Sequence, residues 1–104
     1  MGLDCYRDLD PDDGEVVDAE LVVAEDVLVK AFALGTGAEL PVHEHPDSTN
    51  VFHVVRGTVT VVRGDDEEAI KAPGVVHNAR GVAHGARNDT DEVAVLTASL
   101  CPLP

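Results

Sequence analysis

Basic residues are scarce in this 104-residue chain: seven lysines and arginines stand against 20 aspartates and glutamates, a net charge of −13. Such a surface repels phosphate backbones and lacks the main electrostatic contribution to nucleic-acid binding. We therefore expect no nucleic-acid partner. The acidic clusters fall in expected turns and indicate a solvated surface. A second hypothesis is that the protein is halophilic, because multimolar salt would screen the mutual repulsion of these acids.

Aromatic residues are also few, at 3% of the chain, whereas hydrophobic residues reach 44% and valine dominates them. This composition favours strands over helices. Cys5 and Cys101 are the two cysteines. A disulfide between them is conceivable, but thiols usually stay reduced where no export signal is present. Because the first residues contain no apolar run, we expect neither a signal peptide nor a membrane span, and we expect a cytoplasmic protein.

The length suits one domain. Residues 1–15 are acidic and contain Pro11 and Gly14, so we expect a flexible acidic arm there and a single domain over residues 16–104. Short apolar runs separated by turn residues predict strands that form a small antiparallel barrel or sandwich. The expected strands are 16–24, 27–34, 38–45, 49–56, 58–63, 68–72, 75–77, 81–87 and 93–100.

The strand expected at 49–56 is apolar on both faces, since Val51 and Val55 alternate with Phe52 and Val54. One face belongs to the core. The other needs a second sheet or a partner subunit, because an open antiparallel sheet normally shows polar side chains to water. We therefore predict a homodimer.

His43 and His45 lie in the segment between Gly37 and Gly57. Residues at i and i+2 of a strand point to the same face, so two imidazoles would converge there as metal ligands require. A pair of surface histidines is the alternative. A third histidine, His84, occurs in another glycine-flanked strand.

With these residues the chain resembles the cupin superfamily, over about residues 27–100. The first cupin motif is Gly, five residues, His-x-His, three or four residues, Glu, six residues, Gly. The second is Pro-x-Gly-x-x-His-x-x-x-Asn. The residues that fall on the two motifs are Gly37, His43, His45, Gly57, Gly81, His84 and Asn88. Two positions depart from the motifs, because Asn50 stands where the glutamate belongs and Ala79 where the proline belongs.

The resemblance implies an all-β fold, a small antiparallel jelly-roll (cupin) barrel, often dimeric, with a divalent transition metal such as Zn, Fe, Mn or Ni inside. The ligands carried over are His43, His45 and His84, with Asn50 at the fourth position. A neutral amide is a weaker ligand than a carboxylate. Three outcomes follow: a three-histidine site with open positions, as in the thiol-dioxygenase branch of the family; weak coordination by Asn50; or a metal-free barrel that binds an organic ligand.

Other histidines and charged residues offer alternative ligands. His53 should point away from the site if Asn50, Phe52 and Val54 face inward, and surface or dimer-interface roles are expected for His53 and His77. We expect solvated roles for the nearby carboxylates Glu44 and Asp47. The remaining candidates are arginines, which either pair with surface acids or face the barrel mouth and bind an anionic substrate: Arg56, Arg63 and Arg87.

Two functions stay open. One is a metal-dependent enzyme on a small molecule, dioxygenase- or isomerase-like, with catalytic residues unassigned. The other is a non-catalytic small-molecule binding or sensing barrel. The substrate is not specified by a fold that hosts many chemistries.

Overall fold

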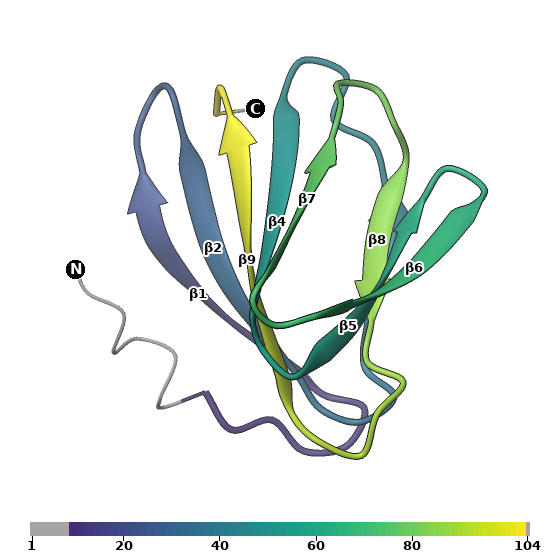
Figure 1. Ribbon diagram of the computed structural model, residues 1–104. Coiled ribbons are helices and arrows are strands. Elements are labelled where there is room, and N and C mark those ends of the chain that lie inside the picture. The colour runs from purple at the N-terminus through teal and green to yellow at the C-terminus, as the bar shows by residue number, and fades with distance from the viewer. Residues whose placement is uncertain (1–8, 104) are drawn as a thin grey trace.

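The computed structural model describes residues 9–103, and these form an all-β structure of two facing antiparallel sheets (Figure 1). The strands coincide with the short apolar runs of the sequence, and in β4 and β7 buried and less buried residues alternate as in a sheet that covers a core on one face. Their bounds are β1 Val16–Val23, β2 Leu28–Leu34, β3 Glu39–His43, β4 Thr49–Arg56, β5 Thr58–Arg63, β6 Asp66–Lys71, β7 Gly74–Asn78, β8 His84–Arg87 and β9 Ala94–Cys101.

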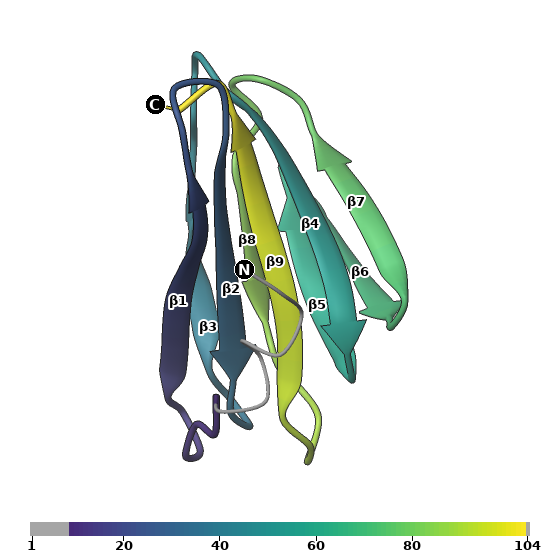
Figure 2. The same ribbon diagram turned by 90° about the vertical axis from the view of Figure 1, so that its left-hand side faces the viewer.

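The larger sheet has five strands in the order β1-β2-β9-β4-β7, and the smaller has four in the order β3-β8-β5-β6. Figure 2 shows them as two layers, with the five-stranded sheet in front. Every pair of neighbouring strands is antiparallel. The predicted antiparallel all-β fold is thereby confirmed. None of the described residues belongs to a helix that could cross a membrane.

The core lies between the two sheets and is built from side chains that alternate inward along each strand. In β4, Asn50, Phe52 and Val54 are buried to 2% exposure or less, whereas His53 is exposed. This confirms the expected orientation of the strand. Buried apolar neighbours include Leu34 and Leu96 from the same sheet, and Val59 and Val61 from the facing sheet. Phe52 is the largest of the fully buried side chains.

Tight turns fix the register of the strands at two glycines. Gly64, with φ of 60°, and Asp65 form a two-residue loop between the paired residues Arg63 and Asp66, so β6 begins two residues earlier than expected. A glycine with positive φ at the first loop position is typical of such hairpins. Gly57 has φ of 73°, and a Cβ added there would lie 2.9 Å from the carbonyl oxygen of Val93. Glycine is therefore required between β4 and β5.

Two strands are three residues shorter than expected, and both lie beside the histidines. β3 ends at His43 instead of at residue 45, because the carbonyl of His45 accepts hydrogen bonds from the amides of Ser48 at 3.4 Å and Gly81 at 3.1 Å. These bonds take residue 45 out of the ladder. β8 begins at His84 instead of at residue 81, since Gly81 belongs to the preceding turn.

The part of the N-terminal segment that the structure describes is bonded to the turn that follows β2. Pro11 is buried, the amide of Gly14 donates to the carbonyl of Thr36 at 2.7 Å, and the amide of Gly35 donates to the carbonyl of Glu15 at 3.0 Å. Residues 1–8, with Cys5, lie outside the described residues, so the possible disulfide to the exposed Cys101 does too.

Candidate metal centre

Three histidines meet at the end of the barrel where β3 and β8 pair. His43 is the last residue of β3 and the cross-strand partner of His84, the first residue of β8, while His45 lies in the loop just after β3. Each offers one ring nitrogen, and these atoms lie within 4.8 Å of one another. The ring centroids are 4.7 Å apart for His43–His45 and His43–His84, and 5.4 Å for His45–His84. The structure therefore brings the predicted histidines together.

Backbone carbonyls fix the tautomer of two of the imidazoles. Nδ1 of His43 lies 2.8 Å from the carbonyl oxygen of Pro41, and Nδ1 of His84 lies 2.9 Å from that of Val82. A carbonyl oxygen can only accept, so each Nδ1 carries the proton and each Nε2 keeps its lone pair. Hydrogen bonds of this kind orient metal-ligating histidines in general.

The Nε2 atom of His84 is buried and has no hydrogen-bond partner among the described residues. An unsatisfied buried polar atom costs free energy, so such an atom needs an explanation. The histidine itself is 1% exposed and faces the other two rings. Its lone pair is directed into a place that a cation could occupy.

The electrostatics of the cluster favour neutral imidazoles. Burial lowers the pKa of His84; the hydrogen bond to Val82 opposes that shift, and the neighbouring His43 and His45 add to it. Burial also lowers the pKa of His45, and His43 lowers it further. Neutral imidazole is the form that coordinates metals. His45 and His84 are thus favoured in the neutral form that a metal requires.

Asn50 lies beside the histidines with its amide committed to a neighbouring strand. It is 2% exposed, and Nδ2 of Asn78 donates to its Oδ1 at 2.8 Å. The two asparagines are cross-strand partners in β4 and β7. This bond leaves Nδ2 of Asn50 as the atom available to a ligand. If both amides were flipped, Asn78 would bury unpaired N–H groups instead of an unpaired oxygen. Buried N–H groups without a partner are rarer in proteins than buried carbonyl oxygens without one, which favours the observed orientation.

A cavity of about 400 Å³ adjoins the cluster inside the barrel. Strands β2, β3, β4 and β9 provide most of its wall. The side chains are mainly apolar. One lysine, Lys30, is also part of the wall, and it was not assigned to the site from the sequence. The lining residues are Leu28, Lys30, Phe32, Leu40, Pro41, His43, His45, Asn50, Phe52, Ala98 and Leu100.

The remaining histidines and carboxylates considered as ligands lie elsewhere. His53 and His77 are exposed on the outer face of the five-stranded sheet, as their alternation with buried neighbours shows. Glu44 and Asp47 are exposed in and after the loop that carries His45. The motif residue Asn88 is fully buried and donates to the carbonyls of Leu34 and Glu92, so its role is to hold the chain between β8 and β9.

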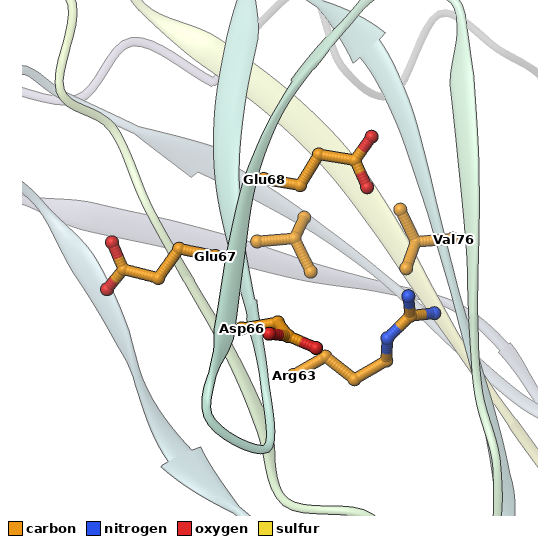
Figure 3. Close-up of a pocket in the computed structure, with 6 residues that line it drawn as sticks. Arg63, Asp66, Glu67, Glu68 and Val76 are labelled. Atoms are coloured by element: carbon orange, nitrogen blue, oxygen red, sulfur yellow. The ribbon is translucent and has the colours of Figure 1, made fainter.

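A second cavity, of about 280 Å³, lies between the edges of the two sheets (Figure 3). Arg63, Glu68 and Val76 point into it, and Glu67 points to the opposite side of β6. Arg63 donates from Nη1 to the carbonyl oxygen of His77 at 3.1 Å and so joins β5 to β7. This contact is structural and holds the two sheet edges together.

The other arginines do not line the histidine cavity either. Arg87 forms a two-pronged ion pair with Glu67, at 2.7 and 2.8 Å, and a further contact with Asp89 at 2.9 Å. These contacts raise the pKa of Arg87 and lower that of Glu67. Arg56 is exposed at the end of β4. Of the two roles considered for Arg87, surface pairing with acids is the one observed.

Comparison with known proteins identifies the family. The sequence pattern of the family described as "Cupin domain" matches residues 31–100. Comparison with curated proteins gives no match. The crystal structure of TT1209 from Thermus thermophilus is similar, with a TM-score of 0.89, 26% identity, and coverage of 97% of this chain and 96% of that one.

Two further solved structures are similar at lower identity and show the fold. An uncharacterized protein with a double-stranded β-helix domain from Klebsiella pneumoniae has a TM-score of 0.86 and 23% identity, over 98% of this chain and 88% of that one. A predicted oxalate decarboxylase from Thermotoga maritima has a TM-score of 0.81 and 21% identity, over 86% and 83%. With the family pattern covering residues 31–100 and two antiparallel sheets enclosing the histidine cluster, the chain belongs to the cupin family.

Proposed function

We propose that His43, His45 and His84 bind a divalent transition metal through their Nε2 atoms, and that the protein is a metal-dependent enzyme acting on a small molecule in the adjoining cavity. The observation that carries this proposal is the buried Nε2 of His84, which has no partner within residues 9–103 and faces two further imidazoles. Nitrogen donors of this type suit Zn, Fe and Ni, whereas Mn prefers oxygen ligands.

Three ligands on one side of an ion leave positions for water and substrate, as catalytic sites need. Asn50 stays outside the ligand set that we propose, because a neutral amide oxygen is a weaker ligand than a carboxylate and this one already accepts a hydrogen bond from Asn78. Its Nδ2 then serves as a donor to an oxygen of the bound molecule. A bound metal of this kind would supply Lewis acidity or activate oxygen. The apolar cavity wall would exclude water and orient the substrate.

A second candidate is a non-catalytic binding or sensing barrel. No carboxylate lines the cavity among the described residues, so a general base other than the histidines is not evident. Turnover assays separate the candidates once a ligand is identified, since a sensing barrel binds its ligand and releases it unchanged.

The metal proposal is tested on tag-free protein purified without chelator and reconstituted with each metal. We expect one metal per chain, loss of that stoichiometry in His84→Ala, and retention in His53→Ala. His53 is a matched control because it lies on the outer face of β4. Substoichiometric metal in the reconstituted wild-type protein would overturn the proposal and favour the metal-free barrel.

We also propose that the protein forms a homodimer through the outer face of the five-stranded sheet. In a chain of net charge −13, this face carries no acidic side chain among the outward positions of its five strands. Val75 is 66% exposed there and Val22 is 41% exposed. A second copy would cover them. The outward positions are Val17, Ala19, Val22, Val29, Ala31, Ala33, Thr49, Val51, His53, Val55, Val75, His77, Val95, Thr97, Ser99 and Cys101. Of these, Ala31, Ala33, Val95 and Thr97 are already buried within the single chain.

A further inference from the structure

We propose that the histidine cavity selects amphipathic organic anions, with Lys30 holding the anionic group and the apolar wall holding the body of the molecule. This inference rests on the proposed function, because it names the class of molecule that would enter the same site. It concerns the end of the cavity remote from the histidines.

Lys30 is the only residue with a permanent charge among those that line the cavity. Its neighbours on the wall are apolar, with Leu28 and Phe32 on its own strand and Ala98 opposite it in the register of β9. A buried apolar wall with a few fixed polar groups is the usual construction of a small-molecule site, and 400 Å³ accommodates a molecule of one ring or a short chain.

Two contacts hold the ammonium group at the cavity. Nζ of Lys30 lies 2.8 Å from a carboxylate oxygen of Asp18 and 5.3 Å from the centre of the Phe32 ring. The lysine side chain is 32% exposed and that of Asp18 is 49% exposed. An ammonium group has three N–H donors, of which Asp18 occupies one. The remaining donors are free to bind a ligand carboxylate.

The charge of the whole molecule explains why such a lysine is needed. Net charge of −13 repels organic anions, and the acidic residues outnumber the basic ones by 20 to seven. No described acidic side chain lines the cavity, whereas one of the chain's two lysines does. Asp18 and the cross-strand partner Glu20 lie beside Lys30 but outside the cavity wall, so a ligand anion inside the cavity competes with them for the ammonium group.

The size of the ligand follows from the register of the sheet. Lys30 pairs with Ala98, and Ala98 pairs with Phe52, whose ring lies 5.6 Å from that of His84. β2 and β4 are separated by β9, so their backbones are about 10 Å apart. We infer from this backbone spacing that a molecule reaching both Lys30 and the histidines has a body of about one aromatic ring between its two polar ends.

The test uses two probes that differ only at the remote end: 4-(hydroxycarbamoyl)benzoate and its uncharged carboxamide analogue. Both carry a hydroxamate for the zinc-loaded histidines. Titration calorimetry on zinc-loaded wild-type protein should show about tenfold tighter binding of the carboxylate, the size of a charge-assisted hydrogen bond. Lys30→Met should abolish this preference without weakening the amide, and Lys30→Arg should keep it.

Two further variants serve as controls. Lys71→Met removes the same charge from the exposed end of β6 and should leave the preference intact. Asp18→Asn removes the competing carboxylate and should strengthen carboxylate binding about two- to threefold, as a modest exposed ion pair predicts. A carboxylate preference that survives in Lys30→Met would overturn the inference. Equal weakening of both probes in that variant would show a structural role for Lys30 and would also overturn it.

The two proposals fail separately. Zinc stoichiometry is measured on each sample before titration, and absence of zinc would contradict the metal proposal alone. The carboxylate preference is then measured on the zinc-free protein, where the same Lys30 dependence supports the inference. If neither the zinc-loaded nor the zinc-free protein binds either probe, the inference is overturned.

Discussion

Replacing Asn50 by glutamate restores the carboxylate of the cupin motif. The substitution should lower the free energy of unfolding of the metal-free protein and increase the stabilisation that bound metal provides. The position is 2% exposed and lines the cavity beside His43 and His45. A carboxylate there can still accept the hydrogen bond from Asn78. Because the position lines the same cavity as His43 and His45, we expect the carboxylate to act as a fourth ligand of a metal on the histidines.

Without metal, the new glutamate is a buried acid that avoids its charge by taking up a proton. The cost of that protonation at pH 7 is about 4 kcal/mol at most, from an ordinary glutamate pKa near 4.3 and 1.36 kcal/mol per pKa unit. This is a large part of the roughly 5–15 kcal/mol that stabilises a domain. With metal, the cost is recovered, and affinity for Mn or Fe should rise by at least about tenfold, since carboxylates suit these ions.

The assay is urea unfolding of wild type, Asn50→Glu and Asn50→Gln, each with and without metal, together with competition titration of Mn and Fe. Asn50→Gln has the length of glutamate without the charge and controls for packing. Metal should stabilise Asn50→Glu more than it stabilises either of the others. Unchanged metal affinity in Asn50→Glu would refute the reasoning and place the metal away from the barrel centre.

Four other predictions follow from the fold and its charges. Because burial lowers the pKa of His45 and His84 below the usual 6.5, these histidines take up protons at a higher pH in the unfolded chain than in the folded one. The free energy of unfolding of the metal-free protein, measured in urea, should therefore be at its maximum above that pH and fall on acidification. Bound metal should be lost over the same pH range. Light scattering should give twice the chain mass, and Val51→Asp should reduce it; a wild-type mass of 10.9 kDa would contradict the dimer. Unfolding in KCl should show stability rising toward multimolar salt, and a fall would argue against the halophilic hypothesis. Gly57→Ala should cost at least about 1–2 kcal/mol in thermal or urea unfolding, since a side chain at positive φ is strained and would contact Val93; wild-type stability would contradict this.

Local alternation was enough to predict most of the sheet. β4 and β5 have the bounds expected, 49–56 and 58–63, because glycines and turn residues delimit apolar runs there. The strands beside the histidines were predicted too long, mainly at the end of β3 and at the start of β8. His45 leaves the ladder because its carbonyl accepts from Gly81, a contact between segments 36 positions apart along the chain. Such a contact has no local sequence signal.

The site was predictable as a histidine cluster and less so as a cavity. The spacing of His43 and His45 placed them together, and the family motif added His84. Lys30 was missed because both faces of β2 are largely apolar, so alternation could not tell which face is inward. Asn78 was missed because its pairing with Asn50 depends on the register of β7 against β4.

The central place of β9 has a consequence for how the protein folds. β9 is the last of the described strands along the chain, yet it lies between β2 and β4 in the larger sheet. Until it inserts, β1-β2 and β4-β7 are two separate strand pairs with exposed edges, which are prone to aberrant pairing. Ala98 and Leu100 of the same strand complete the cavity wall. The barrel can therefore close only after β9 has been synthesised. A ligand that fills the cavity stabilises only chains in which β9 is already in place.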